Sequence, residues 1–172
     1  MPKNIRTHIY CLDGHRSFTD EIRKKFDDTT RYIVDSFHTG EDLSTALERD
    51  KESKACKIVI IGIRDMQGEL QETEKLADCI RKKDPRTGVV VLCPPEKLED
   101  IGKKTELNVD AFIPQNANFI LRVHNTVKKI FSEYNIVIHR ERRNRSLMAV
   151  LAFVILSVML ILFARLKYPD FF

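Results

Sequence analysis

The chain has 172 residues, of which 43% are hydrophobic and 31% are charged, and its formal net charge is +4. This composition is typical of a folded protein and excludes intrinsic disorder as a description of the whole chain. The four cysteines show neither CxxC pairs nor a histidine spacing typical of zinc, so we expect buried free thiols, no metal and no cofactor.

Five short apolar runs predict five strands in the first two thirds of the chain. The third and fourth runs, KIVIIG and GVVVLC, are continuous rather than alternating, which is typical of central strands covered on both faces. The predicted strands are 7–12, 31–36, 57–62, 88–93 and 110–114.

Charged segments compatible with helices separate these strands. The predicted helices are 16–28, 40–50, 69–83, 96–106 and one that begins near residue 117. Alternating strands and helices predict an α/β fold with a doubly wound, five-stranded parallel sheet and right-handed crossovers. In such sheets the ligand-binding and catalytic residues lie on the loops that follow the strands. Here these loops are near Asp13, Gly62, Cys93 and Gln115.

The last of these helices carries apolar residues at alternating spacings of three and four, from Ile120 to Val137. This pattern fits both docking on the sheet and a coiled-coil seam, and we expect its first half to pack on the sheet. Beyond about residue 132, Tyr134, Val137 and Ile138 form an apolar patch that we expect to contact another protein or the bilayer surface.

Residues 146 to 164 are nineteen residues without a charge, glycine or proline. A helix of this length rises about 28 Å, close to the thickness of a bilayer core, so the segment predicts a single transmembrane helix. Four arginines precede it, and this bias places the N-terminal side in the cytoplasm. The N-terminus shows no signal peptide. The arginines, which we expect to contact lipid headgroups, are Arg140, Arg142, Arg143 and Arg145.

The predicted organisation is therefore a domain at 1–134, a basic juxtamembrane stalk at 135–145, a transmembrane helix at 146–166 and a short tail at 167–172. About forty residues follow the domain, and half of them belong to the apolar segment. This leaves no room for a helix-turn-helix, so we expect no nucleic-acid partner.

Four sequence segments resemble those of a known family: IYCLDGH, KIVIIGIRDM, VVVLCPP and NVDAFIPQN. With the strand and helix rhythm, residues 7 to about 134 resemble the receiver domain of bacterial response regulators. The resemblance implies a flavodoxin-like sheet with strand order 2-1-3-4-5. In that family an acid pair binds Mg²⁺, an Asp accepts a phosphoryl group, a Ser or Thr senses it and a Lys pairs with it.

At the matching positions this chain keeps only the first acid, Asp13. A lone carboxylate is a poor Mg²⁺ site, and a glycine cannot accept a phosphoryl group. The sequence therefore predicts an inactive, emptied phosphorylation pocket, because Gly62 places no side chain at the phosphoacceptor position. Asp65 is expected to point away from this pocket and not to replace the acceptor. The matching positions are Asp13, Gly14, Gly62, Cys93 and Gln115.

These features favour a non-enzymatic adaptor or scaffold, a degenerate receiver tethered to the bacterial inner membrane by one span with its domain in the cytoplasm. Its expected partners are other protein subunits, membrane proteins among them, membrane lipid, and a second copy in a homodimer. One alternative is an accessory subunit of a larger respiratory, secretion or motility complex. Another is a phosphorylation-independent ligand or redox sensor that uses the emptied pocket or Cys93.

Overall fold

The computed structural model describes residues 5–14, 18–53, 55–64, 68–97 and 108–167, except for the side chains of Lys97, Arg142 and residues 160–167. Most of the expected fourth helix, from residue 98 onward, lies outside the described residues, and so does Asp65. The elements are β1 (Thr7–Leu12), α1 (Thr19–Lys25), β2 (Tyr32–Phe37), α2 (Gly40–Arg49), β3 (Cys56–Gly62), α3 (Glu69–Lys83), β4 (Gly88–Cys93), the 3₁₀ turn η1 (Pro95–Lys97), β5 (Ala111–Pro114) and α5 (Phe119–Lys167).

All five predicted strands are present, each within one residue of its expected bounds. Helix α1 is shorter than the predicted 16–28 and ends at Lys25. The turn that follows explains this end, because the Asp28 carboxylate accepts hydrogen bonds from the Thr30 amide and hydroxyl. Such side-chain bonds to nearby groups favour a turn over further helix.

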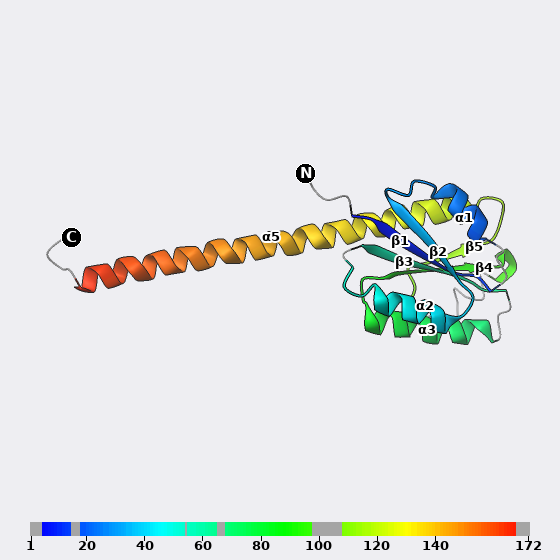
Figure 1. Ribbon diagram of the computed structural model, residues 1–172, viewed down its shortest axis with the longest axis horizontal. Coiled ribbons are helices and arrows are strands. Elements are labelled where there is room, and N and C mark those ends of the chain that lie inside the picture. The colour runs from blue at the N-terminus through cyan, green and yellow to red at the C-terminus, as the bar shows by residue number, and fades with distance from the viewer. Residues whose placement is uncertain (1–4, 15–17, 54, 65–67, 98–107, 168–172) are drawn as a thin grey trace. The chain divides into compact units, whose positions relative to one another are not determined.

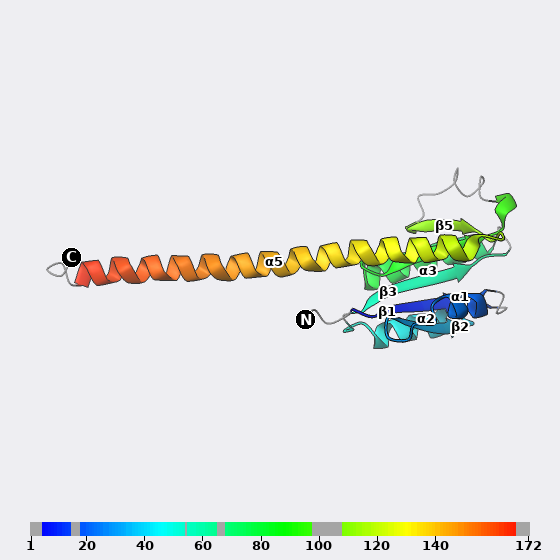
Figure 2. The same cartoon turned by 90° about the horizontal axis from the view of Figure 1, so that it is seen from above.

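The sheet is parallel throughout, with the order β2-β1-β3-β4-β5, which confirms the expected doubly wound α/β fold. Helices α2 and α3 cover one face of the sheet, and α1 and the beginning of α5 cover the other (Figures 1 and 2). Strand β4 is buried along its whole length and β3 in all but Gly62, because both faces are covered.

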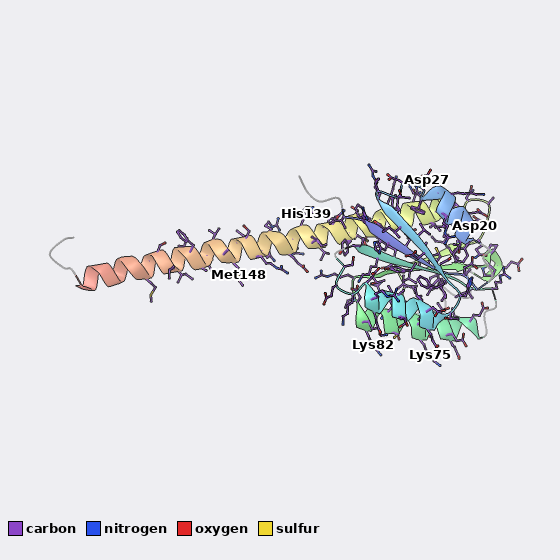
Figure 3. The ribbon with its side chains drawn as sticks, in the orientation of Figure 1. Asp20, Asp27, Lys75, Lys82, His139 and Met148 are labelled. Atoms are coloured by element: carbon purple, nitrogen blue, oxygen red, sulfur yellow. The ribbon has the colours of Figure 1, made fainter. Side chains whose placement is uncertain are left out.

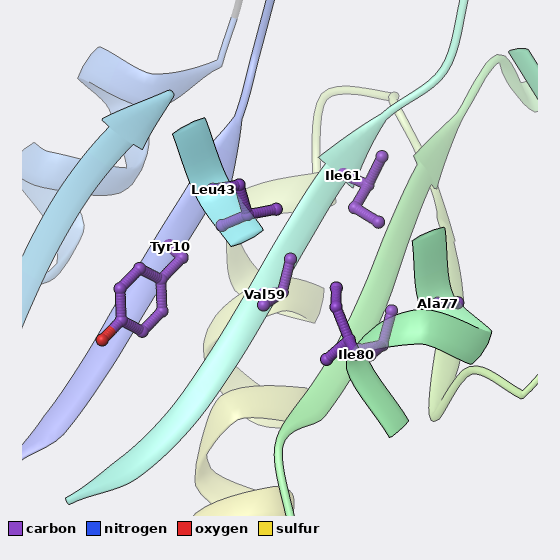
Figure 4. Packing of buried hydrophobic residues seen from close by; sticks show 7 residues of the cluster. Tyr10, Leu43, Val59, Ile61, Ala77 and Ile80 are labelled. Atoms are coloured by element: carbon purple, nitrogen blue, oxygen red, sulfur yellow. The ribbon is translucent and has the colours of Figure 1, made fainter. Parts of the chain in front are cut away.

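The core on the α2 and α3 side is one cluster of buried side chains from three strands and both helices (Figure 4). Tyr10, Val59 and Ile61 lie on β1 and β3, and Leu43 of α2 and Ala77 of α3 pack onto them. Each buried aliphatic side chain of this kind contributes about 1.5–3 kcal/mol by leaving water. The full cluster is Tyr10, Leu43, Val59, Ile61, Ala77, Ile80 and Val89.

Polar links tie the same two helices to the strands near the beginning of β1 and β3. The Tyr10 hydroxyl donates to the carboxylate of Asp50, directly after α2. The Lys57 ammonium, 3% exposed, lies 3.0 Å from the Asp84 carboxylate, directly after α3. Burial alone would raise the pKa of Asp84, but the Lys57 ammonium and the Arg86 amide hold it below its ordinary value. This stabilisation is present above the ordinary pKa and is lost as the pH falls through the lowered value.

The first part of α5 docks on the sheet through Val123 and Val127, which are fully buried, and Ile130. Gly88, the first residue of β4, makes room for this helix, because a Cβ atom there would lie 2.8 Å from Ile130 Cγ2. The prediction that the first half of this helix packs on the sheet is confirmed. One compact unit comprises Met1–Ser132, and Glu133–Phe172 forms the second.

The second unit is the rest of α5, which continues to Lys167. Its large apolar side chains from Leu147 to Met159 are each at least half exposed, and Met148 extends from the helix surface (Figure 3). Within the part of the chain that the structure describes, no helix has both the length and the apolar composition that crossing a membrane requires. The expected span, 146–166, continues past Met159, the last residue whose side chain is described.

Substitution of Gly88 should test the close packing of α5 on β4. Gly88→Ala should lower the free energy of unfolding by about 1–3 kcal/mol, because the added methyl group overpacks against Ile130. Gly40→Ala is the matched control, since its Cβ would lie 3.7 Å from the Leu76 methyl groups and alanine favours a helix. Urea unfolding of the full-length protein in mild detergent, followed by tyrosine fluorescence, measures both.

In an Ile130→Ala background, Gly88→Ala should cost less than about 0.5 kcal/mol beyond the cost of Ile130→Ala itself, because the overlapping atoms are gone. Equal costs of Gly88→Ala in the two backgrounds would contradict the proposed contact.

Candidate functional site

The strands bring the predicted site positions to one edge of the sheet. Leu12 pairs with Ile61, Gly62 with Leu92, and Cys93 with Pro114, so the residues that follow lie at the carboxyl ends of neighbouring strands. Backbone bonds fix two of them: the Asp13 amide donates to Phe37 at 3.0 Å, and the Gln115 amide donates to Cys93 at 2.8 Å. The arrangement is that of one site, and its chemistry depends on the side chains there.

The carboxylate of Asp13 is occupied by the beginning of α1. Asp13 is 4% exposed, and its Oδ2 atom accepts hydrogen bonds from the Phe18 amide at 3.0 Å, the Thr19 amide at 3.3 Å and the Thr19 hydroxyl at 3.1 Å. The first amides of a helix have no partner within the helix, and an acidic side chain there satisfies them. Asp13 therefore has a structural role that any metal would have to displace.

The side of Gly62 on which a Cβ atom would lie is occupied by Phe18, and the inactivity of the pocket stays a prediction. A Cβ atom at Gly62 would overlap the aromatic ring of Phe18, with Phe18 Cε1 nearest and Cδ1 and Cζ each at 3.3 Å. Phe18 is 2% exposed, so its ring is part of the core. The space where a side chain would begin at the end of β3 is filled by this aromatic side chain.

Sequence reasoning missed Phe18 because it stands alone in the loop segment HRSFTD, outside any apolar periodicity. The one available signal was that the sequence has both Phe18, five residues after Asp13, and Gly62 at the end of the third strand. Neither position shows by itself that the two are neighbours in space.

Cys93 is fully buried at the end of β4, and its Sγ atom lies 3.9 Å from the Ile113 carbonyl oxygen. Burial raises the pKa of the Cys93 thiol, and burial raises those of Cys11 and Cys56 to about 12. A thiol reacts as its thiolate, which this environment disfavours. Cys11, Cys56 and Cys93 match the expectation of buried free thiols, whereas the free thiol Cys79 is only half-buried. The geometry gives no support to Cys93 as a redox nucleophile.

Gly14 is exposed, and a Cβ atom there would meet nothing within 4 Å. Gln115 is half-buried and held through its backbone. Within the described residues, no group of three or more histidine, cysteine or acidic side chains is arranged to hold a metal.

A cavity of about 380 Å³ lies beside Gly62, on the face that α2 and α3 cover. Sequence reasoning did not find it, because its polar residues belong to helix beginnings and read as ordinary capping and first-turn positions. Its lining residues are Leu12, His38, Thr39, Gly40, Ile61, Gly62, Glu69, Glu72, Thr73 and Leu76.

The remaining predicted site residues belong to the second unit. Arg140, Arg143 and Arg145 are exposed on α5, and the side chain of Arg142 lies outside the described residues. In the expected partner patch Val137 is exposed, whereas Tyr134 and Ile138 are half-buried. Their roles stay predictions.

The contact between Gly62 and Phe18 gives a direct test of the filled site. Gly62→Ala should lower the free energy of unfolding by about 1–3 kcal/mol, because the methyl group overlaps the ring. In a Phe18→Leu background the further cost should fall below about 1 kcal/mol, since the overlapping ring carbon is absent. Gly14→Ala, which meets open space, is the control and should change stability by less than about 0.5 kcal/mol. Urea unfolding of the full-length variants measures all three, and an unrelieved cost in the Phe18→Leu background would contradict the contact.

No protein-family model and no curated protein matches the chain. It is similar to the response regulator receiver domain protein from Clostridium thermocellum, at 11% identity and a TM-score of 0.59, over 76% of this chain and 98% of that chain. A CheY-like receiver domain protein from Methanospirillum hungatei matches at 17% identity and a TM-score of 0.56, over 76% and 97%. The response regulator TrrA from Thermotoga maritima, in complex with Mg²⁺–BeF, matches at 21% identity and a TM-score of 0.51, over 72% and 98%. The chain therefore has the fold of response-regulator receiver domains.

Proposed function

We propose that the protein is a membrane-tethered adaptor with a receiver fold, which acts through protein contacts, without enzymatic activity and without phosphorylation at the position usual for the fold. The observation that carries this proposal is the Phe18 ring against Gly62. The similar Thermotoga maritima response regulator was solved with Mg²⁺–BeF. Here the matching position has no side chain, and an apolar ring takes the adjoining space.

The chemistry of the edge supports the same conclusion. Acyl phosphate formation requires a carboxylate nucleophile, which Gly62 lacks. Magnesium requires oxygen ligands with near-octahedral geometry, and one of the two carboxylate oxygens of Asp13 already accepts three hydrogen bonds from Phe18 and Thr19. A domain that has this fold without these groups can still bind other proteins through its outer surfaces.

The apolar surface of the second unit supports attachment to a membrane. Ten large apolar side chains between Leu147 and Met159 are at least half exposed, and each is worth about 1.5–3 kcal/mol when fully removed from water. Lipid acyl chains would supply that apolar environment. Arg140, Arg143 and Arg145 precede this segment and would each contribute about 1 kcal/mol next to anionic headgroups. We propose one span in the bacterial inner membrane with the receiver-fold domain in the cytoplasm.

Between the domain and this apolar segment, α5 presents the surface we assign to a protein partner. Ile136 is 64% exposed and Val137 46% exposed, beside the half-buried Tyr134 and Ile138. Apolar and aromatic side chains of this kind are typical of the centre of protein interfaces. A membrane protein, or a second copy of this chain, is the partner that this position near the lipid favours.

A phosphodonor experiment tests the inactive site. The full-length protein in mild detergent is incubated with acetyl phosphate and Mg²⁺, beside a receiver domain that has an aspartate acceptor. Intact mass spectrometry should show the phosphoryl adduct on the control and none on this protein, because Gly62 has no nucleophilic atom. A stoichiometric adduct on this protein that hydroxylamine removes, as it removes an acyl phosphate, would show that another carboxylate has taken over the role.

Membrane attachment is tested by placing charges in the apolar segment. Val154→Arg combined with Val158→Arg should move most of the protein from the membrane pellet to the supernatant at alkaline pH, because each arginine near the centre of a span costs about 2.5–3.5 kcal/mol. The matched control places the same two charges in the basic stalk, as Asn135→Arg with Asn144→Arg, and should stay in the pellet. Release of the unmodified protein by alkaline carbonate would contradict a spanning segment.

A further inference from the structure

Another cavity lies at the edge of the sheet opposite Gly62, where α2 and α3 end and β4 begins. Its volume is about 150 Å³. Ile80 of α3, labelled in Figure 4, and Leu47 of α2 supply its apolar wall. The cavity is therefore separate from the residues at the carboxyl edge. The lining residues are Ser44, Leu47, Glu48, Lys51, Ile80, Lys83, Asp84 and Thr87.

The Thr87 hydroxyl is the feature of this cavity that points to a ligand. Thr87 is fully buried, and within the described residues its Oγ1 atom is the buried side-chain polar atom that has no hydrogen-bond partner. Its backbone is fixed, because the Thr87 amide donates to the Asp84 carbonyl oxygen at 3.1 Å. A buried hydroxyl without a partner costs free energy, so native proteins rarely leave one unsatisfied. A molecule in the cavity that bonds to Thr87 would remove this cost.

The Asp84 carboxylate determines which part of the Thr87 hydroxyl is available. Burial raises the pKa of Asp84, and Thr87 is among the groups that lower it, after Lys57 and Arg86. The Thr87 hydroxyl and the carboxylate do not reach hydrogen-bond geometry, but a carboxylate only accepts, so it favours the hydroxyl hydrogen on its own side. The lone pairs of the Thr87 oxygen are then left for a ligand, which has to supply the donor.

The charges around the cavity balance, and this favours a neutral ligand. Glu48 pairs with Lys83, and Asp84 pairs with Lys57. The remaining charged residue of the lining is Lys51, and it is offset by the ends of α2 and α3, which each carry about half a negative charge. A neutral molecule would leave both ion pairs in place.

The volume and the apolar wall limit the rest of the ligand. A cavity of roughly 150 Å³ lined by apolar side chains holds a molecule of the size of benzene. A six-membered aromatic ring with one attached donor therefore fits this space. A phenol is such a molecule, and with a pKa of about 10 it stays neutral at neutral pH.

From these observations we propose that the cavity binds a small neutral phenol, with its ring against Leu47 and Ile80 and its O–H group donating to the Thr87 oxygen. This inference goes beyond the adaptor role and depends neither on the site at Gly62 nor on membrane attachment. It gives the receiver fold a ligand site at the amino ends of its strands, beside the ion pair of Lys57 and Asp84.

The test uses the full-length protein in detergent micelles with ¹³C-labelled isoleucine methyl groups, titrated with phenol or with benzene. Phenol should shift the Ile80 methyl signal saturably, because its ring lies against that side chain. Ile9 is the internal control and should not shift. It precedes Tyr10 on β1, and successive side chains of a strand point to opposite faces of the sheet.

Thr87→Val should raise the Kd of phenol about fivefold by removing one hydrogen-bond partner, and it should change the Kd of benzene, which has no donor, by less than about twofold. Each ligand is compared between protein variants, so that its partition into the micelles cancels. Thr45→Val is the matched control and should leave the Kd of phenol unchanged, because Thr45 is exposed on α2 and does not line the cavity.

The stability of Thr87→Val without ligand gives a separate measurement. Its urea midpoint should be equal to that of the unmodified protein or higher, because the substitution removes a buried polar group that has no partner. A lower midpoint would show that the Thr87 hydroxyl already has a partner in the folded protein, Asp84 or a water molecule, and would overturn the proposal.

The proposal is also overturned if phenol gives no saturable shift of Ile80, if Ile9 shifts together with Ile80, or if Thr87→Val weakens phenol and benzene equally. None of these results depends on phosphorylation or on membrane attachment, so failure here leaves the adaptor proposal unaffected.

Discussion

The contact between the Phe18 ring and Gly62 is the constraint on which the character of this domain depends. It requires glycine at the end of β3, because any Cβ atom would enter the ring. It also requires Phe18 to lie directly before α1, where the Asp13 carboxylate accepts a hydrogen bond from the Phe18 amide. Three residues from two strand ends and one helix beginning are therefore fixed together, and the Phe18 ring is part of the core.

Other residues at the same edge of the sheet are also held by contacts within the domain. The buried Cys93 closes the sheet at the end of β4 as a small apolar residue would. Gln115 is held by its backbone bond to Cys93, which does not depend on its side chain. A cavity lined by residues of α2 and α3 lies beside Gly62 at this edge.

The fold could be predicted from the sequence to a large extent, because strands buried on both faces read as continuous apolar runs. KIVIIG and GVVVLC identified β3 and β4, and the parallel order followed from the helices between the strands. The end of α1 could not be predicted, since it depends on hydrogen bonds of Asp28 to Thr30.

For the candidate site, the sequence predicted where the strand-end residues lie but not which side chains contact them. The residues at the strand ends do meet at one edge, because parallel strands bring their carboxyl ends together. That Phe18 fills the space, and that Thr73 and His38 line a cavity, depends on which side chains become neighbours across loops and helices, and a periodic pattern does not contain this information. Gly88 is a similar case, since its role became visible only from the position of Ile130.

The links of Tyr10 to Asp50 and of Lys57 to Asp84 lie away from the carboxyl edge, near the opposite ends of the strands. They secure α2 and α3 to the sheet by bonds that involve none of Asp13, Gly62, Cys93 and Gln115. Mutations at the carboxyl edge therefore leave the attachment of these helices intact. The same separation makes the side chains at the carboxyl edge independent of the links that hold the two helices.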